Sequence, residues 1–137
     1  MDGGMGHQLK AMGIKIEGKV GTMERFLGVA LANTREPDLV RDAHIAFIDA
    51  GADVITTNNY AVVPSALKLC NDAVGDEAEL SKLVADAGRA AAAAVAKRPH
   101  KNVLVAGCLP PLNESYRADK VGDFNANVVS APVHERE

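Results

Sequence analysis

Apolar residues recur at helical spacing most clearly in residues 36–52, "EPDLVRDAHIAFIDAGA". Pro37 stands in the first turn of this pattern and Gly51 follows its end, which are the positions that favour these residues at helix starts and ends. The spacing predicts a helix with one apolar face, made up of Val40, Ala43, Phe47 and Ala50.

Other stretches predict further helices. A short one begins at Pro64 in residues 63–72, and a long one covers residues 75–98, with acidic residues at its start and Lys97 and Arg98 at its end. Residues 1–13 combine a glycine-rich turn with a short helical pattern. Residues 14–31 are ambiguous and are assigned no element, because Gly18, Gly21 and Gly28 interrupt any period.

Two segments predict strands. "DVITTNNY", residues 53–60, follows the helix over 36–52, and "NVLVAGCLPP", residues 102–111, follows the helix over 75–98. The second is a continuous apolar run, which is typical of a strand covered on both faces. Strands that alternate with helices predict an α/β fold with a parallel sheet.

Polar groups follow both predicted strands. Five hydrogen-bonding side chains run from Thr56 to Tyr60, "GCLPP" ends the second strand, and "DGG" opens the chain. Functional groups of parallel sheets gather where strands end, so these loops predict one site. Asp2 could hold a ligand's ammonium group or belong to a loose terminal turn. Thr57 and Asn58 could line a pocket or form an Asx-type turn.

Composition narrows the class of protein. The 137 residues are 47% apolar and carry a net charge of −3 with interspersed signs, which predicts a folded core and neither a nucleic-acid nor an acidic-membrane partner. No run approaches the roughly 20 apolar residues of a membrane span, and no secretory leader is visible. A cytoplasmic location is expected.

Candidate reactive residues have simpler structural interpretations. His44 is expected to be half-buried and hydrogen-bonded, and Cys108 to be a small core residue, because neither Cys70 nor a nearby histidine completes a metal motif. "GIKIEGKV", residues 13–20, nearly matches a phosphate-binding loop, but Val20 has no hydroxyl and no buried strand precedes it. A nucleotide-binding domain therefore ranks last.

"DGGMG", "PDLVRDAHIAFIDAGADVITTNNY" and "VLVAGCLPPLNESYRAD" together resemble the homocysteine S-methyltransferase family over residues 2–119. The resemblance implies a (β/α)₈ barrel that methylates homocysteine to methionine, with a sulfonium donor such as S-methylmethionine. It also implies zinc, which holds a thiol as thiolate. The implied substrate-binding residues are Asp2, Gly3, Gly4, Thr57, Asn58 and Gly107.

The sequence departs from the family pattern at several positions. His7 and Asn59 stand where threonine is usual, Cys108 replaces serine, and the Gly-Gly-Cys-Cys segment that carries zinc ligands is absent. A barrel usually needs about 250 residues. We therefore expect a partial barrel of N-terminal βα units in residues 1–120, a divergent extended or disordered tail over 121–137, and no activity from this chain alone. The alternative is a non-catalytic fragment that binds or self-associates through open sheet edges.

Overall fold

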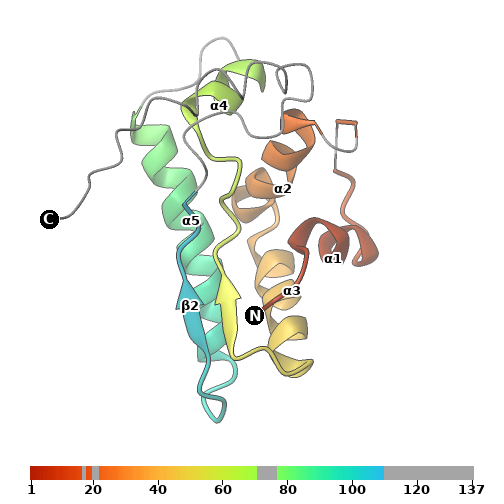
Figure 1. Ribbon diagram of the computed structural model, residues 1–137, viewed down its shortest axis with the longest axis vertical. Helices are drawn as coiled ribbons and strands as arrows, with labels where there is room; N and C mark the ends of the chain where they lie inside the picture. Colours follow the sequence, from red (N-terminus) through yellow and green to blue (C-terminus); the bar gives the residue numbers. More distant parts are fainter. Residues whose placement is uncertain (17, 20–21, 71–76, 110–137) are drawn as a thin grey trace, which may run out of the picture.

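The computed structural model describes residues 1–16, 18–19, 22–70 and 77–109 of the chain. These residues form a mixed α/β structure that is mostly helical and contains a small parallel sheet (Figure 1). In chain order the elements are α1 (Met5–Ala11), α2 (Met23–Arg35), α3 (Pro37–Asp49), β1 (Val54–Thr56), α4 (Pro64–Cys70), α5 (Glu77–Ala96) and β2 (Leu104–Ala106).

The helices with clear start and stop signals form as predicted. α3 begins at Pro37, and Gly51 follows it at a φ of 100°, a left-handed conformation that glycine adopts without a Cβ clash. α4 begins at Pro64, α5 spans most of its predicted range, and α1 occupies the short N-terminal pattern. Local signals were therefore sufficient for four of the described helices.

The face of α3 that is buried differs from the predicted one. Ala50 is exposed at the C-cap, Phe47 is half-buried, and the buried residues are Val40, Ala43, His44 and Ile48. The helix ends at Asp49, so Ala50 does not continue the apolar stripe. His44 takes a place in that stripe instead.

α2 forms where no element is predicted. Thr22 caps its start, because the hydroxyl oxygen accepts the Arg25 amide hydrogen at an N–O distance of 3.4 Å. Leu27, Ala30 and Ala32 lie on its buried face. Burial of this face against neighbouring elements outweighs the low helix propensity of Gly28.

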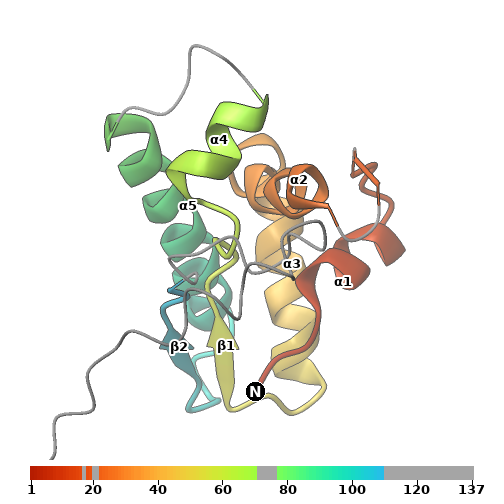
Figure 2. The same cartoon turned by 45° about the horizontal axis from the view of Figure 1, so that its top comes forward.

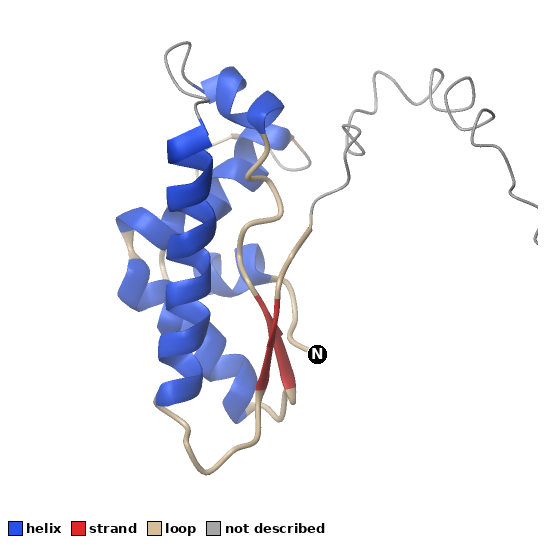
Figure 3. Cartoon of the chain, turned by 90° about the vertical axis from the view of Figure 1, so that its left-hand side faces the viewer, coloured by secondary structure: helices blue, strands red, loops and turns tan. Residues whose placement is uncertain are grey.

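The sheet consists of β1 and β2, which pair in parallel with Val54 opposite Leu104 and Thr56 opposite Ala106. α5 connects them, and among the described residues the helices lie on one side of the strands (Figure 3). Leu104 and Val105, whose side chains point to opposite faces of the sheet, are 63% and 42% exposed. The prediction that this second strand is covered on both faces is therefore wrong.

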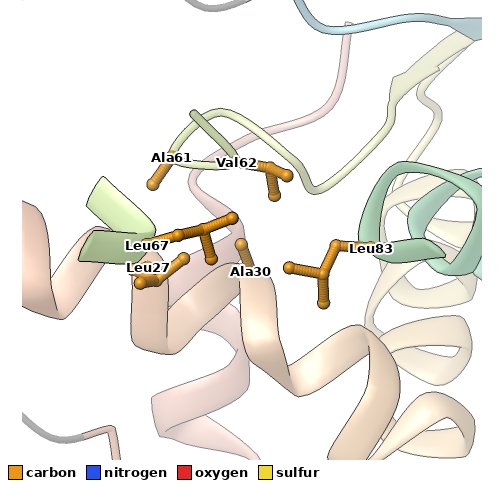
Figure 4. Close-up of a cluster of buried hydrophobic side chains, with 6 residues drawn as sticks. All are labelled: Leu27, Ala30, Ala61, Val62, Leu67 and Leu83. Atoms are coloured by element: carbon orange, nitrogen blue, oxygen red, sulfur yellow. The ribbon is translucent and has the colours of Figure 1, made fainter. Parts of the chain in front are cut away.

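The described residues form three hydrophobic core clusters. One joins α2, α4, α5 and the loop after β1, through Leu27, Ala30, Ala61, Val62, Leu67 and Leu83 (Figure 4). A second forms around Leu9 of α1, with residues of α2, α3 and α5. The third packs Ile55 of β1 against Ile48 of α3 and the alanines of α5. Because small alanines let α3 and α5 approach closely, the third cluster holds β1 in place from both helices.

The nucleotide-binding alternative finds no support in this fold. A phosphate-binding loop follows a strand, but Gly13 follows α1, and Ile14 and Ile16 pack against the cluster around Leu9. The predicted tail over 121–137, and the domain boundary at its start, lie outside the described residues. None of the described helices combines the length and apolar character that crossing a membrane requires.

Candidate functional site

The N-terminal segment, the end of β1 and the end of β2 meet at one place. Figure 2 shows the N-terminal segment running beside β1. The Asp2 amide donates a hydrogen bond to the Val54 carbonyl at 2.9 Å, and the Thr57 amide donates to the Ala106 carbonyl at 2.9 Å. The three loops that the sequence predicts at one rim are thus adjacent.

The Asp2 carboxylate is held by the end of β1. The Thr56 amide donates to Oδ2 at 2.8 Å, and the Thr56 hydroxyl donates to Oδ1 at 3.0 Å. The side chain is only 7% exposed. Each carboxylate oxygen can accept a further hydrogen bond, so the group keeps acceptor capacity for a cation. Thr56 is not among the residues that the sequence analysis assigns to the site, so this contact was missed.

Thr57 and Asn59 connect β1 to the loop after β2. The Thr57 hydroxyl accepts the Cys108 amide hydrogen at 2.9 Å and donates to Asn59 Oδ1 at 2.6 Å. The Asn59 amide nitrogen donates to the Cys108 carbonyl at 3.0 Å. These bonds place Gly107, the residue before Cys108, next to Thr57. Together they fix the relative position of two strand ends.

Asn58 points toward α2. Its side-chain nitrogen donates to the Val29 carbonyl at 2.8 Å and to Asn33 Oδ1 at 3.4 Å. Asn33, which is 2% exposed, donates in return to the Asn58 carbonyl at 2.6 Å. These contacts give Asn58 a structural role, and its part in substrate binding stays a prediction.

The three predicted glycines are exposed, but their surroundings differ. A Cβ on Gly3 would lie 3.0 Å from Cε1 of Phe47, and one on Gly4 would lie 3.3 Å from Nδ1 of His7. A Cβ on Gly107 would meet nothing within 4 Å. Close packing therefore explains glycine at position 3, whereas Gly107 leaves open space at the strand end.

His44 was predicted to be half-buried and hydrogen-bonded, and both parts of that prediction are wrong. Its side chain is 0% exposed, and neither ring nitrogen has a hydrogen-bond partner among the described residues. Nδ1 lies 4.0 Å from Oδ2 of Asp2. The spacing of four residues from both Val40 and Ile48 is the signal that could have shown this burial.

The possible metal ligands among the described residues do not suit zinc. The described residues contain no group of three or more histidine, cysteine, aspartate or glutamate side chains that could hold a metal ion. Burial raises the pKa of the Cys108 thiol, which disfavours the thiolate that a metal requires. The residues described here therefore do not fit the structural requirements of a zinc site.

A groove of about 420 Å³ lies elsewhere, among α2, α3 and α5. Arg41, Lys82, Asp86 and Arg89 contribute to its walls, and none of the predicted substrate-binding residues does. Lys82 and Arg89 both pair with Asp86. Asn33, whose side chain donates to the Asn58 carbonyl, also lines the groove, so this residue connects the groove with the end of β1.

Comparisons with known proteins identify the lineage. The family model described as homocysteine S-methyltransferase matches residues 1–133 of the 137-residue chain. A comparison with solved structures finds no significant match. Because the family model covers nearly the whole sequence, the chain belongs to the homocysteine S-methyltransferase family.

Proposed function

We propose that this chain binds L-homocysteine where β1 and β2 end, as the amino-acid-binding part of a methyltransferase. The proposed site comprises Asp2, Gly3, Gly4, Thr57, Asn58 and Gly107. The observation that carries the proposal is the anchored carboxylate of Asp2, whose two oxygens each accept one bond from Thr56. Their remaining lone pairs suit the α-ammonium group of an amino acid.

The proposed reaction is methyl transfer from a sulfonium donor such as S-methylmethionine. The homocysteine thiol loses its proton to solvent and its sulfur forms a bond to the methyl carbon, while the bond from that carbon to the sulfonium sulfur breaks and its electrons stay with the donor's sulfur. Both products are then methionine when S-methylmethionine is the donor. Family membership supports this reaction class. No residue described here is assigned a role in the transfer itself.

We further propose that the 137-residue chain binds homocysteine without turning it over. A thiol is a poor nucleophile near neutral pH, and zinc in the family supplies the thiolate. The described residues offer no set of ligands for that metal. We also propose that the fold is the N-terminal part of a (β/α)₈ barrel. The element order β1, α4, α5, β2 and the parallel pairing of the two strands support this proposal, because parallel strands joined through helices build such barrels.

Calorimetry with L-homocysteine tests the binding proposal. The wild-type chain should bind, Asp2→Asn should bind at least tenfold more weakly, and Asp53→Asn should bind like wild type. Asp53 is a matched control because it is an exposed aspartate just before β1. Equal affinities for wild type and Asp2→Asn would refute the role of Asp2. Methionine formation above a no-protein blank, with added zinc, would refute the proposal of binding without turnover.

A second candidate function is self-association of two copies through the sheet. Leu104 and Val105 of β2 expose large apolar side chains, and such strands favour pairing with another chain. Light scattering after size-exclusion chromatography distinguishes the candidates. A dimer that Leu104→Lys converts to monomer supports association, and a wild-type monomer at high concentration excludes it.

A further inference from the structure

The environment of His44 is the least satisfied part of the described structure. Both of its ring nitrogens are buried and have no hydrogen-bond partner in the part of the chain that the structure describes, and the side chain has no exposed surface there. A buried polar group without a partner costs free energy that folding must offset elsewhere. The carboxylate of Asp2 is the charged group close to this ring, and its Oδ2 lies 4.0 Å from Nδ1 of His44.

That distance is too long for a hydrogen bond. A movement of about 1 Å would bring Nδ1 and Oδ2 to the usual separation for a charge-assisted bond. The Thr56 amide and hydroxyl already hold the two carboxylate oxygens, Oδ2 among them. The histidine therefore lies where it can complete the hydrogen bonding of Asp2 from α3.

We propose that His44 is a positioning residue, whose ring N–H bonds to the Asp2 carboxylate and holds it for the ammonium group of the ligand. The ligand part rests on the proposed function, whereas the contact between His44 and Asp2 does not. His44 is not proposed to touch the substrate or the reacting sulfur. It orients the Asp2 carboxylate from α3.

The charges around α3 leave Asp2 as the acid that acts on His44. Burial lowers the pKa of His44, and the charge of Asp2 opposes that change. Among the described residues, several other charged groups of α3 and of the helices packed on it pair with one another: Arg41 with Asp38 and Asp42, Asp49 with Arg98 and Lys101, and Asp86 with Lys82 and Arg89. His7 and Lys10 of α1 are exposed, and Arg25 of α2 donates to the carbonyls of Ile16 and Gly18. The charge that acts on the pKa of His44 is that of Asp2.

Nitrogen NMR of the histidine rings tests the contact without any ligand. In the wild-type chain, His44 should show one dominant tautomer with the proton on the nitrogen that faces Asp2. Asp2→Asn should lower the pKa of His44 further, because it removes the opposing charge, and Asp53→Asn should leave it unchanged. An unchanged pKa and tautomer in Asp2→Asn would overturn the proposal.

Calorimetry with L-homocysteine tests the consequence for binding. His44→Leu should weaken binding roughly tenfold, the equivalent of one hydrogen bond to a charged group. His44→Asn should recover part of the loss, because its amide can donate near the position of Nδ1. His100→Asn, at an exposed histidine, should have no effect. Wild-type affinity in a folded His44→Leu chain would overturn the positioning role.

The two experiments separate the inference from the function on which it rests. If the wild-type chain does not bind homocysteine, the proposed function fails, and the NMR comparison still decides whether His44 contacts Asp2. If His44→Leu does not fold, the comparison of His44→Asn with wild type decides the binding effect. Equal affinities of His44→Asn and wild type for homocysteine would then count against the proposal.

Discussion

Replacing Asn58 with alanine tests whether this residue is structural. The substitution removes the side-chain bonds to the Val29 carbonyl at 2.8 Å and to Asn33 Oδ1 at 3.4 Å. It also leaves the oxygen of Asn33 without that donor at a position that is 2% exposed. A lost hydrogen bond costs about 1 kcal/mol, and an unsatisfied buried group raises the cost, so we expect a loss of about 1–3 kcal/mol.

Urea denaturation followed by circular dichroism measures this loss directly. The transition midpoint should fall while its slope stays the same, because the surface exposed on unfolding hardly changes. The melting temperature should fall by about 4 °C for each kcal/mol lost in a chain of this size. Asn102→Ala is the matched control, since Asn102 is exposed before β2 and its loss should change nothing.

The result that refutes this reasoning is a chain with Asn58→Ala that unfolds like wild type. If such a chain also lost homocysteine binding, Asn58 would be a ligand-binding residue, and its contacts with α2 would be incidental. If Asn58→Ala lowers the stability of the fold but leaves the affinity for homocysteine unchanged, Asn58 serves to hold the end of β1 against α2.

Three further predictions concern stability. Ile55→Ala should cost about 2–5 kcal/mol in urea denaturation, because Ile55 is 0% exposed in the core; a cost below 1 kcal/mol contradicts its burial. Gly3→Ala should cost about 1 kcal/mol, because its Cβ would lie 3.0 Å from the Phe47 ring; an unchanged midpoint contradicts this close approach. The hydrogen bond from the Thr34 hydroxyl, together with Lys82 and Arg89, lowers the pKa of Asp86 from 3.8 to about 2. The ionised carboxylate therefore stabilises the fold above pH 3.8, and this stabilisation is lost as the pH falls to about 2. Thr34→Val should therefore differ most from wild type near neutral pH and converge with it near pH 2; a constant difference refutes the linkage.

Sequence patterns predicted the elements that carry local signals. Pro37 and Gly51 bound α3, and the acidic residues at the start of the long helical pattern lie in the first turn of α5. α2 was missed because Gly18, Gly21 and Gly28 interrupt the period in and before it, and the burial that stabilises it comes from residues distant in sequence such as Leu67 and Leu83. Long-range packing of this kind leaves little trace in a local window.

The candidate site was predicted in outline and not in its contacts. The polar strand end and the opening Asp-Gly-Gly indicated that Asp2 and β1 meet, and they do. Side-chain direction alternates along a strand, so a shift of one residue separates Thr56, which binds Asp2, from Thr57, which faces Cys108. The exposure of Leu104 and the burial of His44 depend on which elements cover each face, and composition alone does not specify that.

The most direct test of the central claim is a titration of L-homocysteine into the ¹⁵N-labelled chain, followed through backbone amide shifts. We predict saturable shifts at Gly3, Gly4, Thr57 and Gly107 that disappear in Asp2→Asn. Shifts confined to the groove around Arg41, or no shifts at any amide, would contradict a homocysteine site where β1 and β2 end.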